Sequence, residues 1–380
     1  MHETVAALQA RGVAAEVFTA DQIPGYRRTP WAYVDSRRCR SALRGRLRAF
    51  DPDVVHLHNF YHELSPGILA TLGRWRDRAG VTRPRRIVMT VHDHHLICPN
   101  SGLLSVSRGE LVPADPARLH SLRYLLSRGW DYRGLRYSLL KLAQHLWNYR
   151  LHRRRRVIDV VICPSRYMRT LLDGFGFATI ALPHPLPPAP TGVRRSGDEL
   201  RFVFAGRVEP EKGLERFLEL LPENFPGRLD VIGEGSSLAE CRRIRRRRRL
   251  EAHVRFAGRL TRSETVERIA AAHVLVLSSL CPENAPMSLL EALAVGTNIL
   301  VSNLGGAREV VQRSGVGFFF RPDDAGSLRE ALDGIDRARA DGTLNAFDVS
   351  AYLEGRTQSA YVEQLVDVYA NALSASASDG

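Results

Sequence analysis

Residues 201–214 have the sequence RFVFAGRVEPEKGL, in which a short apolar run precedes a turn and a helical pattern. Phe202–Ala205 contains no polar residue, which is typical of a strand in a parallel sheet that is covered on both faces. Gly206 ends this run, and a helix is expected to begin near Leu214. A strand followed by a helix is the repeating unit of a parallel α/β domain.

The same unit recurs along both halves of the chain. In the first half, strands are expected at Ala15–Thr19, Asp53–His58, Arg86–His92, Val157–Cys163 and Thr179–Pro183, with helices such as Ser36–Phe50 and Ser65–Asp77 between them. In the second half, strands are expected at Arg201–Ala205, Arg228–Ile232, Val254–Ala257, Val274–Leu277, Asn298–Val301 and Gly317–Phe320. This alternation predicts an α/β fold of two doubly wound, Rossmann-like domains that face each other across a cleft, with ligands at the carboxyl ends of the strands.

A proline-rich segment separates the two halves. Residues 183–190 have the sequence PHPLPPAP, which can form neither a helix interior nor a central strand. We therefore predict an N-terminal domain over residues 1–187, a linker over 188–197 and a C-terminal domain over 198–358. A final helix over 359–373 is expected to pack back toward the N-terminal domain. The length of 380 residues suits two domains.

Composition narrows the class of protein. With 44% hydrophobic and 25% charged residues, the chain has the composition of a globular protein. It contains no run of about 18 apolar residues and no signal-peptide core near its N-terminus, so a cytoplasmic location is expected. The five cysteines include no C-x-x-C pair, which favours buried thiols over a zinc site or disulfides. The net charge is +13, and Lys141 and Lys212 are the only lysines.

Much of the positive charge lies in a helical insert expected over residues 116–156. From Arg118 to Arg156 the sequence has eleven basic residues and one acidic residue, with tyrosines and tryptophans between them. Leucines recur there at helical spacing: Leu135, Leu139, Leu142 and Leu146. An apolar helix face beside arginines predicts contact with an anionic membrane surface, which would place the protein peripherally at the inner face of the membrane, or with a lipid-linked acceptor. The alternative is a helix packed on the first domain with a solvated basic face. No nucleic-acid-binding motif accompanies the charge, so no nucleic acid partner is expected.

Two motifs that follow strands are suited to binding phosphate. Arg207 and Lys212 flank the turn after Phe202–Ala205, and an arginine fork with a lysine point charge suits a pyrophosphate. The alternative is a pair of solvated loop charges, but the scarcity of lysine favours a functional role. Gly233 and Gly235 lie between a strand and a helix, where glycines let a ligand approach the backbone. A dinucleotide site is disfavoured because the third glycine of that fingerprint is absent.

The segment 282–296, PENAPMSLLEALAVG, places two carboxylates near the start of a helix. Glu283 is expected in a loop and Glu291 on the helix, so they would reach different parts of one extended ligand. A carboxylate can accept both protons of a vicinal diol, and two carboxylates suit a ligand with two sugars, as a nucleotide sugar has. The alternative is simple stabilisation of the helix dipole.

Taken together, the order Gly-Arg-x4-Lys, Gly-x-Gly, Glu-x7-Glu and then GGARE at residues 305–309 resembles the retaining glycosyltransferases of family 4, which have the GT-B fold. The resemblance implies that Arg207 and Lys212 bind the donor diphosphate, that Glu291 holds the ribose diol, and that Glu283 contacts the transferred sugar. It also assigns the lining of the donor pocket to Gly233, Gly235, Leu260, Asn284, Ala285, Pro286, Met287 and Ser288.

In the first half, residues 53–59 and 90–99 resemble the same family, in which the histidine that matches His92 lies beside the reacting sugar. His92 ends an apolar strand, which favours it over the general expectation that a histidine is structural; His94 and His95 are weaker candidates. Asp51-Pro52-Asp53 is expected to end a helix and begin a strand, rather than to bind a metal.

These observations predict a hexosyltransferase-type enzyme that moves a sugar from a nucleotide-diphosphosugar to a glycan or lipid-linked acceptor, as in polysaccharide biosynthesis. Retention of configuration follows from the resemblance. Neither a metal nor a cofactor is expected, because Arg207 and Lys212 can neutralise the leaving diphosphate. The alternative is an epimerase, or an inactive, truncated relative that still binds a nucleotide sugar. The sequence opens on a helix, so the family's first strand and its glycine-rich loop are expected to be missing, which predicts poor transfer.

Overall fold

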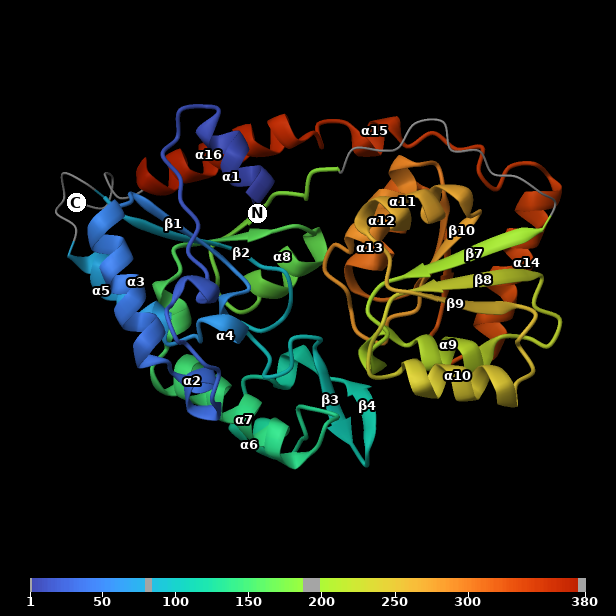
Figure 1. The fold of residues 1–380 in the computed structure, drawn as a ribbon, viewed down its shortest axis with the longest axis horizontal. Coiled ribbons are helices and arrows are strands. Elements are labelled where there is room, and N and C mark those ends of the chain that lie inside the picture. The colour runs from blue at the N-terminus through green and yellow to red at the C-terminus, as the bar shows by residue number, and fades with distance from the viewer. Residues whose placement is uncertain (1, 79–83, 187–198, 375–380) are drawn as a thin grey trace. The chain divides into compact units, whose positions relative to one another are not determined.

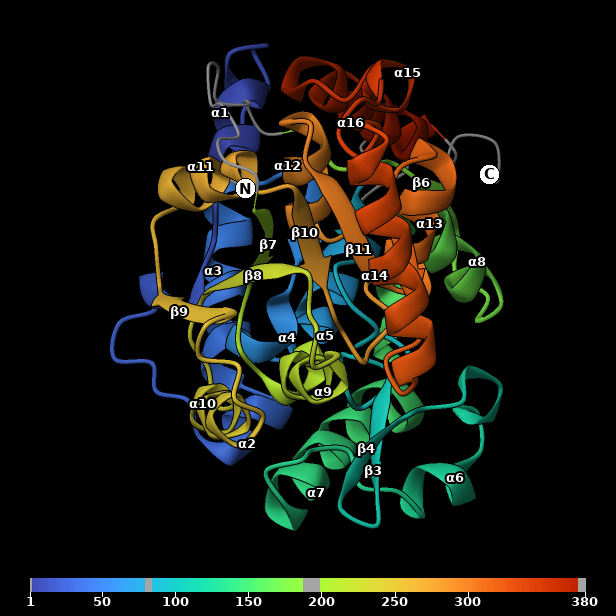
Figure 2. The same cartoon turned by 90° about the vertical axis from the view of Figure 1, so that its right-hand side faces the viewer.

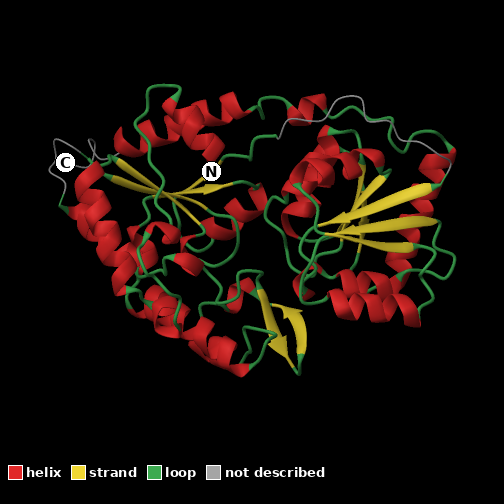
Figure 3. Ribbon diagram, viewed as in Figure 1, coloured by secondary structure: helices red, strands yellow, loops and turns green. Residues whose placement is uncertain are grey.

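The computed structural model describes residues 2–78, 84–186 and 199–374, and the linker expected over 188–197 lies outside these ranges. The chain forms two compact units (Figure 1). The first unit comprises Met1–Pro183 with Gln358–Gly380, and the second comprises His184–Thr357. Each unit contains a parallel sheet with helices packed against it (Figure 3).

The first sheet has four parallel strands in the order β1-β2-β5-β6. They are β1 (Val54–His58), β2 (Arg86–Thr90), β5 (Val160–Cys163) and β6 (Thr179–Ala181). These confirm four of the five strands expected in this half. The expected strand Ala15–Thr19 is wrong, because this segment pairs with no described strand and is irregular. Its apolar residue Ala15, with Val13, instead packs beside the C-terminal helix.

The helices of the first unit confirm the expected pattern. They are α1 (His2–Gln9), α2 (Pro30–Val34), α3 (Arg37–Phe50), α4 (Phe60–Glu63), α5 (Ile68–Asp77), α8 (Arg166–Asp173) and α16 (Gln358–Ser374), with a short 3-10 turn η1 (Ala20–Gln22). Ser36 caps α3, since its hydroxyl accepts a hydrogen bond from the backbone N–H of Cys39 at 3.2 Å. Asp51 ends α3 in the left-handed conformation, with φ 46°, and β1 begins three residues later. The expected break at Asp51-Pro52-Asp53 is therefore confirmed.

The segment expected as a long helical insert is a series of short elements. They are η2 (Pro116–Arg118), α6 (Leu122–Leu126), α7 (Leu135–His145), the π-helical η3 (Leu146–Leu151) and η4 (Arg154–Val157). A hairpin of β3 (Leu104–Ser107) and β4 (Glu110–Pro113) precedes them and was not expected. The strand expected over Val157–Cys163 begins later than predicted, at Val160, because Val157 is the last residue of η4. Within the described ranges, no helix combines the length and apolar character that a membrane span requires.

The second sheet has six parallel strands in the order β12-β11-β10-β7-β8-β9. They are β7 (Leu200–Ala205), β8 (Gly227–Ile232), β9 (Val254–Gly258), β10 (Val274–Leu277), β11 (Asn298–Ser302) and β12 (Phe318–Phe320). Each lies within one residue of its expected bounds, so the sequence pattern predicts this sheet well. β7 pairs with both β8 and β10 and is an inner strand of the sheet.

Helices cover both faces of the second sheet. They are η5 (Pro210–Lys212), α9 (Leu214–Leu220), α10 (Leu238–Arg247), α11 (Arg262–Ala271), α12 (Met287–Ala294), α13 (Gly305–Ser314), α14 (Ala325–Ala340) and α15 (Ser350–Leu353). Figures 1 and 2 show α9 and α10 on one side of the sheet and α11 and α12 on the other. Phe202 and Phe204 face the first group of helices, whereas Val203 faces the second. This alternation explains why residues 202–205 of β7 are all apolar.

The C-terminal helix α16 completes the first unit. Its buried residues Val362 and Leu365 pack in one cluster with Val88 of β2 and Ile162 of β5. Arg86 adds a polar contact, since its Nε donates to the backbone oxygen of Ala372 at 2.6 Å. The end of the described chain thus supplies one covering layer of a sheet that is formed by its first half.

This packing predicts that Leu365→Ala destabilises the first unit. Leu365 is fully buried, and removing such a side chain leaves a cavity that costs about 2–5 kcal/mol. Gln364→Ala is the matched control, because Gln364 is exposed on the same helix. Denaturant unfolding followed by far-UV circular dichroism measures both variants. Equal stability of the two variants would contradict the packing role of α16.

Candidate functional site

A lysine and a glutamate from different loops form an ion pair in the second unit. Lys212 lies in η5, after β7, and its Nζ lies 2.6 Å from Oε1 of Glu283, which follows β10. Two further contacts join the same loops. The Ser278 hydroxyl donates to the backbone oxygen of Lys212 at 2.9 Å. The backbone N–H of Leu280 donates to the backbone oxygen of Glu211 at 2.9 Å. The position of the lysine is therefore determined by the β10 loop as well as by its own loop.

The charge state of this pair follows from its surroundings. Burial disfavours the ammonium of Lys212, but the carboxylate of Glu283 outweighs this effect, and the pKa of Lys212 is raised. The same carboxylate oxygen accepts a hydrogen bond from the hydroxyl of Ser279 at 2.5 Å. The sequence predicted separate ligand contacts for Lys212 and Glu283 and did not predict that they pair with each other.

Arg207 has a more open environment than Lys212. Its side chain is 68% exposed and lies 3.2 Å from Glu211. An ion pair whose arginine is largely exposed contributes little stability, so the guanidinium can turn toward a ligand at low cost. One carboxylate oxygen of Glu211 is buried and has no hydrogen-bond partner among the described residues. Sequence reasoning did not identify Glu211, because an acidic residue in a polar turn carries no distinctive signal.

Gly233 and Gly235 lie where the loop after β8 crosses the loop after β7. The backbone N–H of Val208 donates to the oxygen of Glu234 at 2.9 Å. Gly233 has φ 137°, and a Cβ there would lie 1.9 Å from the oxygen of Gly206. A Cβ at Gly235 would lie 2.2 Å from the oxygen of Val208. Both positions require glycine for the packing of these two loops, whether or not a ligand is bound.

Glu291 lies on α12 and forms an ion pair with Arg262 of α11. Its carboxylate Oε1 is 3.6 Å from Nε of Arg262. Burial raises the pKa of Glu291, and Arg262 partly opposes this shift. Because the Arg262 side chain is 58% exposed, it can leave the carboxylate when a ligand arrives. Arg262 was not among the sequence-predicted residues, since it lies on a different helix and only the fold brings it to Glu291.

The remaining predicted donor residues lie in the same part of the second unit. Leu260 is half-buried in the turn between β9 and α11. Asn284 is buried, and Ala285, Pro286, Met287 and Ser288 are half-buried at the start of α12. The backbone N–H of Gly306 donates to the oxygen of Glu283 at 2.6 Å and anchors this loop. All these residues follow the carboxyl ends of β7, β8, β9 or β10, which share one edge of a parallel sheet.

In the first unit, His92 follows β2 and pairs with a second histidine. Its Nε2 lies 3.0 Å from Nδ1 of His58, the last residue of β1. His56 lies two residues earlier on β1, with Thr90 Oγ1 at 2.8 Å and Tyr369 Oη at 2.7 Å from its two ring nitrogens. Burial lowers the pKa values of His56 and His92, so both rings are neutral at pH 7. His58 was not predicted as a site residue, although its place at a strand end could have identified it.

His94 and His95 are both buried, in the loop that follows His92. The backbone N–H of His95 donates to Oδ1 of Asp93 at 2.9 Å, and its ring stacks on Tyr61 at a centroid distance of 3.5 Å. Burial raises the pKa of Asp93 to about 6, although Tyr61 donates a hydrogen bond to its other oxygen. Nδ1 of His94 lies 3.1 Å from the backbone oxygen of Ser101, so both histidines contact other residues of the first unit.

The described ranges contain no group of three or more histidine, cysteine, aspartate or glutamate side chains that could hold a metal ion. Asp51, part of the Asp-Pro-Asp segment, instead lies 2.6 Å from Nη2 of Arg85.

Two family models match this chain. The model described as Glycosyltransferase Family 4 matches residues 1–184, and the model described as Glycosyl transferases group 1 matches residues 191–338. Together they account for most of the chain and for the motifs of both units.

Individual proteins are similar over shorter stretches or by fold. Glycogen synthase of Mycobacterium tuberculosis is 32% identical over 140 residues, which cover 35% of this chain and 33% of that protein. The match therefore spans about a third of this curated relative. Sucrose-phosphate synthase of Thermosynechococcus elongatus has a similar fold, with a TM-score of 0.71 and 17% identity over 98% of this chain and 92% of that chain. HepE of Anabaena in complex with UDP-glucose has a TM-score of 0.61 and 16% identity over 96% and 88%. These likenesses establish the GT-B fold.

The buried histidines predict an acid-sensitive first unit. His145, at the end of α7, is buried, and burial together with Arg155 and Arg150 lowers its pKa to about 3. The unfolded chain binds a proton near pH 6.5, whereas the folded chain does not. The contribution of His145 to the free energy of unfolding is therefore fully present above pH 6.5. It falls by about 1.4 kcal/mol per pH unit as the pH decreases toward 3.

His145→Gln should weaken this dependence, while His120→Gln, at an exposed position in the same insert, should not. Melting temperatures between pH 7 and pH 5 provide the measurement. An unchanged slope in His145→Gln would show that this histidine is not responsible.

Proposed function

Because the chain belongs to the group 1, family 4 glycosyltransferases, we propose that it transfers a sugar from a nucleotide-diphosphosugar to a glycan or lipid-linked acceptor. The observation that carries the proposal is the Lys212–Glu283 pair, which joins a cation suited to phosphate with a carboxylate suited to a sugar. The binding of UDP-glucose by HepE, a protein of similar fold, supports a donor of this kind.

The donor diphosphate would be bound by Lys212 and Arg207. A lysine ammonium has three donors, so Lys212 can keep its bond to Glu283 and still donate to phosphate oxygens. Arg207 supplies a second, exposed cation. As the bond between sugar and diphosphate breaks, negative charge grows on the leaving oxygen, and preorganised cations stabilise it. We therefore propose that the reaction proceeds without a metal or cofactor.

The two carboxylates would have separate roles. Glu291 would accept hydrogen bonds from the ribose diol once Arg262 moves aside. Glu283, held by Lys212 and Ser279, would accept hydrogen bonds from hydroxyls of the transferred sugar. We propose His92 of the first unit, a neutral ring hydrogen-bonded to His58, as a catalytic residue. We propose that the acceptor enters on the face from which the diphosphate leaves, with retention of configuration.

The direct test is a screen of several nucleotide sugars with the purified protein, with free nucleotide and transferred sugar both quantified. Release of nucleoside diphosphate, stimulated by an added acceptor, is the expected result. Conversion of one nucleotide sugar into another without an acceptor would indicate an epimerase. Binding without turnover would indicate an inactive relative.

Variants of the second unit separate two of the proposed roles. Lys212→Ala should lower turnover about a hundredfold or more, because a charge partner of the leaving group is lost. Glu291→Ala should mainly raise the KM for the donor, since a ribose contact persists throughout the reaction. Arg329→Gln, at an exposed position on α14, is the control. Near-full turnover by Lys212→Ala would refute the phosphate assignment.

We also propose that the insert binds an anionic membrane surface, where a lipid-linked acceptor would be found. Its exposed apolar side chains include Leu135 on α7, 73% exposed, and Leu139, 55% exposed. Trp31 is 84% exposed on α2, which packs against α7 (Figure 1). The exposed Arg136 lies between Leu135 and Leu139 in the sequence. Arginines beside exposed apolar side chains are typical of interfacial binding. Leu142 is buried, so the apolar face expected from the sequence is divided between the core and solvent.

Vesicle co-sedimentation tests this surface. The protein should bind liposomes that contain anionic lipid at low salt and bind neutral liposomes weakly. Leu135→Ser/Leu139→Ser should weaken binding about tenfold, whereas Ala143→Ser, an exposed position on the same helix, should have little effect. Absence of binding to anionic liposomes would refute this role and favour a solvated basic face.

A further inference from the structure

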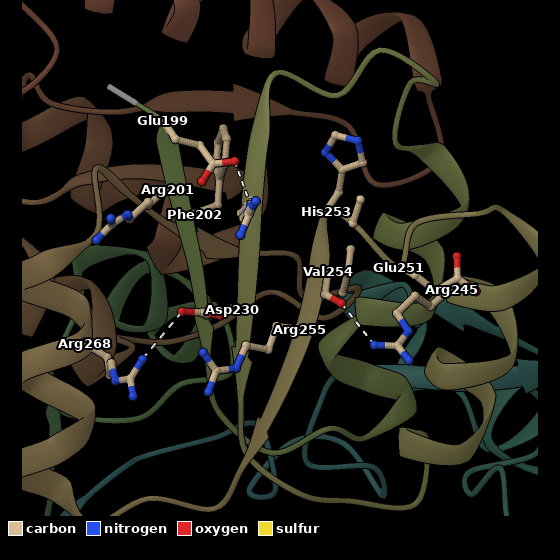
Figure 4. A pocket seen from close by; sticks show the side chains of 12 residues that line it. Glu199, Arg201, Phe202, Asp230, Arg245, Glu251, His253, Val254, Arg255 and Arg268 are labelled. Carbon is tan, nitrogen blue, oxygen red and sulfur yellow. Dashed lines mark hydrogen bonds and ion pairs between the residues drawn. The ribbon is translucent and has the colours of Figure 1, made fainter. Parts of the chain in front are cut away.

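A pocket of the second unit lies at the amino ends of β7, β8 and β9 (Figure 4). It has a volume of about 500 Å³. Arg201, Arg228 and Arg255 are each the second residue of their strand. The residues proposed to bind the donor follow the opposite, carboxyl ends of the same strands. A strand of six residues spans about 20 Å, so the pocket is separate from the proposed donor site.

The sheet register places charged side chains side by side in this pocket. Arg201 is the partner of Arg228 across β7 and β8, and Asp230 is the partner of Arg255 across β8 and β9. Residues in register lie about 5 Å apart in adjacent strands, and their side chains share one face of the sheet. The same face is apolar farther along, where Val203 packs beneath the helices.

The arginines of the pocket are incompletely neutralised. Arg228 lies 2.7 Å from Glu199. Arg268 of α11 lies 3.9 Å from Asp230, and a dashed line joins these two residues in Figure 4. Arg201 and Arg255 form no ion pair with any residue in the described ranges. Arg201 and Arg228 are like charges directly opposite each other in the sheet, which is destabilising. An anion bound beside these two arginines would reduce this repulsion.

Protection of a sheet edge explains only part of this arrangement. Charged side chains on an edge strand discourage pairing with another chain, and β9 is an edge strand of this sheet. β7 and β8 are inner strands, however, and Arg201 and Arg228 lie on them. Edge protection therefore leaves the facing arginines of the inner strands unexplained.

We propose that this pocket binds a phosphorylated carbohydrate. Guanidinium groups bind phosphate oxygens in a fork geometry, and Arg201 and Arg255 are available for this role. The carboxylates of Asp230 and Glu199 accept hydroxyl protons, which suits a polyol rather than phosphate alone. The volume is that of a site for a small molecule. The ligand carries one phosphate ester and several free hydroxyls.

Isothermal titration calorimetry of the full chain with glucose 6-phosphate, at constant ionic strength, tests the proposal. Glucose 6-phosphate is expected to bind more tightly than inorganic phosphate, which lacks the sugar hydroxyls, and more tightly than glucose, which lacks the phosphate. Arg201→Gln/Arg255→Gln should raise the Kd at least about tenfold. Because both positions are exposed, folding should be preserved, and a melting curve checks this.

Two controls locate the binding. Lys212→Ala and Arg329→Gln should each leave the Kd within about twofold of the parent value. Loss of binding in Lys212→Ala but not in the double variant would place the phosphate at the donor site and overturn the proposal. No measurable binding of glucose 6-phosphate, or binding no tighter than that of inorganic phosphate, would also overturn it. None of these outcomes depends on transferase activity, so failure here is distinct from failure of the proposed function.

Discussion

The parallel pairing of β7 with β8 and β10 is the constraint on which the second unit depends. Parallel strands begin at one edge of a sheet and end at the other, so every loop after a strand reaches the same edge. Residues that are 71 positions apart in the sequence, Lys212 and Glu283, form an ion pair for this reason. The apolar residues 202–205 keep β7 inside the sheet, and Lys212 lies in the loop beyond its carboxyl end.

Both ends of the sheet carry charge, but in different arrangements. At the carboxyl ends, Lys212 is neutralised by the half-buried carboxylate of Glu283, which the hydroxyl of Ser279 also holds in place. At the amino ends, Arg201 and Arg228 lie opposite each other in register. The charges are matched in the first arrangement, whereas the second has an excess of positive charge. The parallel sheet thus carries basic residues at both of its ends.

The first unit depends on a different constraint, the burial of polar side chains within its core. His94, His95, Gln144 and His145 are buried there together with the aromatic rings of Tyr61 and Tyr149. Desolvation keeps His95 and His145 neutral, and stacking of His95 on Tyr61 fixes the loop that follows His92. The candidate catalytic histidine is therefore positioned by a polar core that no motif in the sequence marks.

The sequence by itself determined the α/β class, the six strands of the second unit and the residues that follow their carboxyl ends. These features depend on local apolar runs and on turns next to them, which a linear pattern records directly. Only the tertiary structure decided that Ala15–Thr19 is not a strand, because a strand requires a ladder partner. It also decided the pairing of Glu291 with Arg262 and of Arg201 with Arg228. Such contacts depend on register and on helix placement, which arise when distant segments pack together.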